Sequence, residues 1–272
     1  MMTVKSHEYL VITIALFLTA AVAVNFITFV TATLIAIFAA SLWCYDYFLN
    51  HNNRIGFYVS WSCAIVLGIL VGLYRPHDFN YPLVFSVEQF YDGGLPSSLY
   101  INIAKFFAGI ITLFFLLSYK PVTPIYIQSK FSQFTFSLVL ALLILGMAYE
   151  ILDLQIHVKP FKYILLFGLV NLLVTCLAEE AFMRLLLQSQ IQKFISGTIK
   201  HRFWQEIIPL GITTFIFVVT HSVQGLNNIL IYTVAGFCYG LIYSLTKNVW
   251  ASIAVHFTVN IIHFSFFTYP LA

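Results

Sequence analysis

The sequence predicts an all-α protein, a polytopic transmembrane helical bundle of eight to nine spans. Two observations support this fold class. Hydrophobic residues make up 61% of the 272 residues and charged residues only 8%, whereas soluble domains carry about 25% charged residues. Apolar runs of roughly 20 residues, the length a helix needs to cross about 30 Å of hydrocarbon, recur along the chain. We therefore expect an integral membrane protein in contact with the lipid bilayer.

Nine apolar runs are separated by polar or turn-forming residues. The first two are the hardest to divide, because about forty apolar residues follow Tyr9 with only Asn25 and a few threonines between them. The predicted spans cover residues 9–24, 27–48, 56–74, 99–119, 133–152, 161–187, 207–223, 227–245 and 249–268.

The basic residues of the loops orient these spans, because Lys and Arg accumulate in short cytoplasmic loops. Nine spans with a cytoplasmic N-terminus place most basic loop residues inside. They are Lys5, Arg54, Lys120, Lys130, Lys193, Lys200, Arg202 and Lys247. The long loop at residues 75–98 falls on the opposite side. It is rich in Pro and Gly, has few helix signals, and is expected to lie on the membrane surface.

Composition also argues against several functions. The net charge of +3 is small and the basic residues are scattered, so no basic patch for nucleic acid is expected. Cys44, Cys63, Cys176 and Cys238 lack the spacing of metal ligands and are interpreted as small buried apolar residues. No cleavage site follows the first apolar run, so a cleaved signal peptide is not expected.

Three ionisable residues lie close together inside the sixth predicted span. Such residues cost about 2.5–3.5 kcal/mol each at a helix centre and are functional candidates by default. Glu180 and Arg184 are four residues apart and share a helix face, while Glu179 lies about 100° round. We expect Glu180 to be anchored by Arg184 and Glu179 to be available as a general base for water. A purely structural ion-pair network is the alternative.

The next two polar spans add His221, and then His256 and Asn260 on one helix face. His263 continues that face and is interpreted as structural. Each group alone could be an interhelical hydrogen bond. Together they offer a base, two imidazoles and an amide donor, enough to activate water and stabilise an oxyanion.

The ordered motifs EExxxR, FxxxH and HxxxN resemble those of one family of membrane proteases. It comprises the CAAX prenyl proteases of the Rce-one type and the bacteriocin-processing enzymes, known as the CPBP or ABI family of intramembrane glutamate-type proteases. The likeness covers roughly residues 161–267 and suggests a protease domain at residues 131–272. Residues 1–130 form an N-terminal transmembrane region of unassigned role.

The resemblance implies a role for each motif residue. Glu179 and His221 would activate the attacking water, and His256 and Asn260 would hold the oxyanion of the tetrahedral intermediate. The other motif residues would support the site or pack around it; they are Glu180, Arg184 and Phe217.

The activity implied by the resemblance is that of an endopeptidase in a bacterial inner membrane. It would cut a peptide bond near the C-terminal tail or a membrane-proximal segment of a protein substrate. A prenylated tail and a C-terminal sorting tail are both compatible with the family, and no cofactor is required.

Three alternatives stay open. Glu179, His221 and His256 could form a His₂Glu catalytic zinc site, although HExxH is absent. The polar cluster could be the proton relay of a proton-coupled transporter. The same fold could also serve as a non-catalytic membrane assembly or immunity protein. Neither GxSxG nor GxGD occurs, so serine and aspartyl intramembrane proteases have no support.

The depths of the candidate residues disagree in this prediction. At about 1.5 Å per residue from the predicted cytoplasmic ends, Glu179 and His256 lie about 10–12 Å deep and His221 about 21 Å. Groups that act on one bond must lie at one level, so either the helix that carries His221 begins deeper than predicted, or helix tilt and side-chain reach close the gap.

Overall fold

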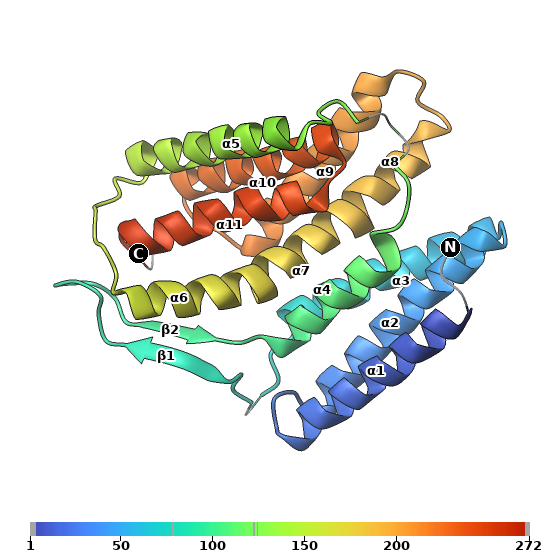
Figure 1. The fold of residues 1–272 in the computed structure, drawn as a ribbon, viewed down its shortest axis with the longest axis horizontal. Coiled ribbons are helices and arrows are strands. Elements are labelled where there is room, and N and C mark those ends of the chain that lie inside the picture. Colours follow the sequence, from blue (N-terminus) through green and yellow to red (C-terminus); the bar gives the residue numbers. More distant parts are fainter. Residues whose placement is uncertain (1–3, 78, 122, 124, 270–272) are drawn as a thin grey trace. The chain divides into compact units, whose positions relative to one another are not determined.

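The computed structural model describes residues 4–77, 79–121, 123 and 125–269, and these are predominantly helical (Figure 1). Within this part of the chain, seven helices are long and apolar enough to cross a membrane. Two shorter apolar helices, Ile12–Ala23 and Ile103–Leu116, match the remaining predicted spans. The prediction of an all-α polytopic membrane protein is confirmed.

Two compact units make up the chain, and the first consists of residues 1–83 and 100–119. In it, α2 packs against α3 and α4. Asn25 has a left-handed backbone (φ 57°) and the Thr28 side chain caps the next helix, so the first long apolar run is two helices, as predicted. The helices are α1 Val4–Ala23, α2 Phe29–Asn50, α3 Arg54–Leu73 and α4 Ile103–Leu116.

The second unit consists of residues 84–99 and 120–272 and contains the three motifs. Helix α10 packs against α5, α9 and α11, and it has the largest buried share of the candidate spans. The separate helices are α5 Lys130–Ile151, α9 Arg202–His221, α10 Leu226–Thr246 and α11 Val249–Phe266.

The segment predicted as a surface loop contains a two-stranded sheet, β1 Leu83–Val87 and β2 Ser97–Tyr100. The buried ring of Phe85 packs in a cluster with Phe167 and Phe264. Alternating apolar residues in a Pro- and Gly-rich segment favour this arrangement, because the turn formers join two short strands. Part of the segment therefore packs on the helices of the second unit.

One continuous helix from Phe161 to Ser196 replaces the shorter predicted span at 161–187. The polar residues after Leu187 do not end it, because the protein interior satisfies them. Gln190 Nε2 donates to the Leu185 carbonyl, for example, at 2.9 Å. The helix comprises α6 Phe161–Val170, η1 Asn171–Cys176, α7 Leu177–Glu180, η2 Ala181–Gln188 and α8 Ser189–Ser196, of which η1 and η2 are π-helical.

Helix α9 contains Pro209, which cannot donate a hydrogen bond to the carbonyl four residues earlier. That carbonyl belongs to Gln205 and accepts from Gln192 Nε2 of α8 at 3.1 Å instead. Prolines are tolerated in membrane helices where a neighbouring helix satisfies the released carbonyl. This contact positions α9, and with it the motif that ends at His221.

The turn between α10 and α11 is held to α9 by a buried ion pair. Lys247 Nζ lies 2.7 Å from both carboxylate oxygens of Glu206, and the two side chains are 3% and 13% exposed. Removing one partner of a buried pair leaves an uncompensated charge and costs about 3–5 kcal/mol. The pair therefore matters for keeping α9, α10 and α11 together.

We predict that Lys247→Met lowers the melting temperature of the detergent-solubilised protein, and that adding Glu206→Gln recovers part of the loss. Thermal unfolding of the wild type and the variants measures this. A double variant no more stable than Lys247→Met would show that the unpaired Glu206 charge is not the cause of the lost stability.

Candidate functional site

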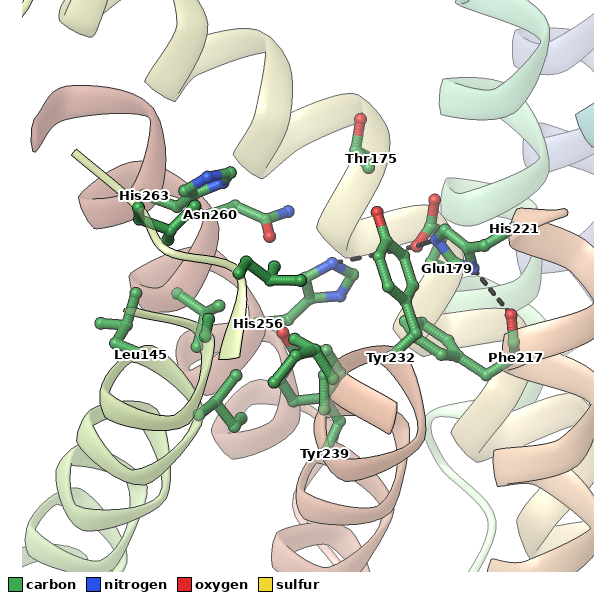
Figure 2. Close-up of a pocket in the computed structure, with 17 residues that line it drawn as sticks. Leu145, Thr175, Glu179, Phe217, His221, Tyr232, Tyr239, His256, Asn260 and His263 are labelled. Carbon is green, nitrogen blue, oxygen red and sulfur yellow. Dashed lines mark hydrogen bonds and ion pairs between the residues drawn. The ribbon is translucent and has the colours of Figure 1, made fainter. Parts of the chain in front are cut away.

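The second unit encloses a cavity of about 150 Å³ into which the predicted catalytic residues point (Figure 2). Glu179, His221, His256 and Asn260 all line it. The opposite wall is apolar and comes largely from α5, including Ile144, Leu145 and Ala148. The cavity thus places a polar constellation against an apolar surface within the membrane-spanning helices.

Glu180 is fully buried and joins two of the motifs. Its Oε2 lies 2.8 Å from Arg184 Nε, and its Oε1 lies 2.8 Å from His256 Nδ1. The pairing of Glu180 with Arg184 is the one predicted from their spacing of four residues. The contact with α11 adds that Glu180 orients the imidazole of His256.

Glu179 occupies a different environment from its neighbour. Its side chain is 15% exposed, against 0% for Glu180, and it points into the cavity. Its Oε2 lies 3.6 Å from His221 Nε2 and 3.9 Å from His256 Nε2. One carboxylate is therefore enclosed by a guanidinium and an imidazole, while the adjacent one faces two imidazoles and the cavity.

His221 is the last residue of α9, and Ser222 after it has a left-handed backbone (φ 50°). The His221 Nδ1 atom lies 2.7 Å from the Phe217 carbonyl, which can only accept a hydrogen bond. In the neutral ring Nδ1 therefore carries the proton, and Nε2, which faces Glu179, is an acceptor. The ring also packs on Phe217, with centroids 4.2 Å apart.

The depth disagreement changes in the structure. Glu179 and His221 lie at similar distances from their helix ends, whereas His256 lies only about 10 Å from the start of α11, yet the three side chains meet at the cavity. The helix that carries Glu179 continues to Ser196, which places Glu179 about 25 Å from that helix end at 1.5 Å per residue. His221 lies about 28 Å from the start of α9 on the same measure. The predicted end at Leu187 was wrong, because the buried glutamines extend the helix.

Two π-helical stretches flank the carboxylate pair, with η1 immediately before α7 and η2 immediately after it. A π-helix widens the turn, changes the angle between successive side chains and occurs frequently at functional sites. The sequence prediction assumed 3.6 residues per turn throughout. It therefore could not predict the directions in which the side chains after this segment point.

Arg184 extends the polar network away from the cavity. Its Nη1 donates to Gln188 Oε1 at 2.8 Å, and Gln188 Nε2 donates to the Gly240 carbonyl at 3.1 Å. Gln188 was not among the predicted residues. Its position four residues after Arg184 was the signal that could have identified it, since i and i+4 side chains share a face.

Two tyrosines of α10 complete the aromatic wall and were also missed. Tyr239 stacks on the His256 ring, with centroids 4.5 Å apart and planes at 15°. Tyr232 lies 5.1 Å from the His221 ring. Both line the cavity, so they restrict the orientations of the two imidazoles.

Asn260 lies one turn after His256 on the cavity wall (Figure 2). Its Nδ2 is 3.9 Å from Cys176 Sγ. His263, interpreted from the sequence as structural, lines the same cavity one turn further along. The helical face predicted from the HxxxN motif is therefore the face that borders the cavity.

The residues proposed for a possible zinc site meet, but at a wide spacing. Across the described residues, no group of three His, Cys, Asp or Glu side chains has the spacing for a shared metal ion. Glu179 nevertheless lies within 4 Å of both imidazoles.

Comparison with known proteins found one family. Residues 161–262 match the family model described as type II CAAX prenyl endopeptidase, Rce1-like. The matched segment includes the complete EExxxR, FxxxH and HxxxN motifs. No curated protein and no solved structure matches the chain.

Gly240 provides a test of the packing around Arg184. A Cβ atom at this position would lie 2.4 Å from Leu210 Cδ1 and 2.6 Å from Arg184 Nη1. We predict that Gly240→Ala displaces the guanidinium and destabilises the protein by about 1–3 kcal/mol. A lower melting temperature in detergent would report it.

Gly211 is the matched control, because it also lies in a membrane helix and a Cβ there meets nothing within 4 Å. We expect Gly211→Ala to leave the melting temperature unchanged or slightly higher. Equal effects of the two substitutions would contradict the close approach at Gly240.

Proposed function

We propose that this chain is an intramembrane endopeptidase in which Glu179 and His221 activate water, because residues 161–262 match the model of the Rce1-like family of CAAX prenyl endopeptidases. The observation that carries the proposal is the 3.6 Å approach of Glu179 Oε2 to His221 Nε2 at the wall of the cavity. Both atoms are hydrogen-bond acceptors when the carboxylate is ionised and the ring is neutral. A water molecule at about 2.8 Å from each could donate one hydrogen bond to Glu179 Oε2 and the other to His221 Nε2.

In the first step, the water oxygen attacks the carbonyl carbon of the scissile peptide bond. The C–O bond forms while a water proton passes to Glu179, with His221 holding the water in line. The carbonyl oxygen becomes an oxyanion. In the second step the C–N bond breaks, the proton on Glu179 passes to the leaving amine, and the carboxylate is restored.

His256 and Asn260 are the proposed oxyanion donors. Asn260 Nδ2 belongs to the cavity wall, and His256 Nε2 lies on the Glu179 side of its ring. Because Nδ1 of His256 bonds to Glu180, the ring must be an imidazolium to donate from Nε2 as well. Glu180 contacts both this ring and Arg184, and the two carboxylates of Glu179 and Glu180 together balance the two cations.

The proposed substrate is the C-terminal tail or a membrane-proximal segment of a protein, prenylated or carrying a sorting sequence. Either kind of tail brings a peptide bond to the bilayer, where the cavity lies. We propose that the enzyme lies in a bacterial inner membrane, as the family resemblance implies, with a cytoplasmic N-terminus, which the loop charges favour.

We predict that Glu179→Gln leaves the protein folded but lowers cleavage at least a hundredfold, since it removes a general base worth about 10²–10⁴ in rate. The assay uses two kinds of substrate. One is a quenched fluorescent peptide with a farnesylated CAAX-type tail, and the other is a set of peptides copied from protein tails that remain uncut in membranes lacking the protein. Glu150→Gln is the control, because Glu150 is exposed on α5 and does not line the cavity.

Full residual cleavage by Glu179→Gln would overturn the assignment of the base. If the protein instead supports proton-coupled uptake in proteoliposomes, and Glu179→Gln abolishes that uptake, the cluster is a proton relay and the peptidase proposal fails.

For the metal alternative, we propose that the carboxylate and imidazoles act without a metal ion. We predict that chelator treatment leaves the rate of cleavage within twofold and that elemental analysis of active protein finds no stoichiometric zinc. Zinc at one ion per chain, lost together with activity, would make Glu179, His221 and His256 metal ligands instead.

A further inference from the structure

His263 has no part in the proposed chemistry, yet it borders the same cavity. It lies on α11 two turns after His256, with Asn260 between them, and Figure 2 shows the three side chains in a row along the cavity. The row leads from the proposed reacting groups toward the far end of the cavity. A substrate bound at Glu179 could therefore extend past His263.

One nitrogen of the His263 ring is buried and lacks a partner. The ring forms a hydrogen bond with the backbone of Thr268. The Thr268 N–H already donates to the Gln155 carbonyl, so the Thr268 carbonyl is the group that the ring bonds. His263 Nε2 has no hydrogen-bond partner in the described part of the chain. Nδ1 is thus the donor, and Nε2 of the neutral ring is a buried acceptor.

A buried acceptor without a partner is costly, and the cavity suggests what could satisfy it. A peptide in an extended conformation carries a backbone N–H at each residue that must find an acceptor once it leaves water. The helices around the cavity use their own backbone groups internally. Side chains on the wall must therefore bond the peptide, and His263 is a residue of that wall whose buried Nε2 acceptor has no partner in the described part of the chain.

The spacing along α11 sets which part of the substrate would reach this atom. His263 follows His256 by seven residues, or about 10.5 Å of helix. An extended chain advances about 3.3 Å per residue, so this distance spans about three residues.

We infer that His263 is a substrate-binding residue whose Nε2 accepts a hydrogen bond from a main-chain N–H of the substrate, about three residues from the cleaved bond. The inference rests on the proposed peptidase function and names a specificity determinant of that site. Proline lacks the N–H, so the protease discriminates against substrates with proline at that position.

The test replaces single backbone amides by esters, which removes one N–H without adding bulk. A scan covers four residues on each side of the cleaved bond in the fastest-cleaved tail peptide. With the full-length wild type in detergent, we expect one position near the third residue where the ester lowers kcat/KM about tenfold. A peptide with proline at that position should be cleaved at least as poorly as the ester.

The His263 variants connect that position to the ring. In His263→Phe the all-amide peptide should itself be cleaved about tenfold more slowly, and the ester should add less than a twofold effect. His263→Gln keeps an acceptor oxygen and should keep part of the ester sensitivity. An unchanged ester profile in His263→Phe, or no sensitive position in the wild type, would overturn the inference. If a buried water molecule and not the substrate bonds Nε2, the wild type will show no ester-sensitive position.

Binding separates this inference from the peptidase proposal. Fluorescence anisotropy measures the amide and ester peptides on Glu179→Gln, where we expect about tenfold tighter binding of the amide and no difference after His263→Phe is added. This result together with no cleavage by the wild type would sink only the peptidase proposal. Equal binding of both peptides, or no binding, would sink the inference.

Discussion

The buried ion pair between Glu180 and Arg184 connects two of the three motifs of this membrane protein and links them to α10. Neither side chain is exposed, and each has further partners. Glu180 reaches His256 on α11, while Arg184 reaches Gln188 and, through it, the backbone of α10 at Gly240. A buried ion pair contributes little stability by itself because of the desolvation cost of its charges. Here it sets the relative positions of the helices around the cavity.

The contrast between the two adjacent glutamates follows from this network. Glu180 is enclosed by Arg184 and the His256 ring, whereas Glu179, one residue earlier, turns toward the cavity and two imidazoles. A step of about 100° around a helix is enough to separate a structural carboxylate from a candidate reactive one. The proposed chemistry depends on that separation, because a base that is also an ion-pair partner would not be available to water.

Polar groups elsewhere in the second unit obey the same constraint. Burial within the bilayer requires a partner for each polar group, since water is not available to compensate. Gln192 supplies the donor that Pro209 removes from α9, and Lys247 is enclosed with Glu206. His263 Nε2 departs from this pattern, as do Arg184 Nη2 and Thr214 Oγ1, but unlike those two side chains His263 lines the cavity, which is why it points to a ligand.

Much of the architecture and the site could be predicted from the amino-acid order alone, because the signals are local. Apolar runs near 20 residues placed the spans, and the break at Asn25 was visible. A spacing of four residues paired Glu180 with Arg184 and put His256 and Asn260 on one face. These inferences need only helical periodicity and the cost of polar groups in hydrocarbon.

Other features required the tertiary structure, because they depend on contacts between distant segments. The helix continues to Ser196 because other parts of the protein bury its glutamines, and this extension brings Glu179 level with His221. The π-helical turns around Glu179 and the packing of Phe85 on Phe167 have no local signal. From the sequence, His263 was interpreted as structural, because periodicity shows only that it shares a helix face with His256 and Asn260. Only the folded arrangement of α5, α10 and α11 shows that this face borders a cavity.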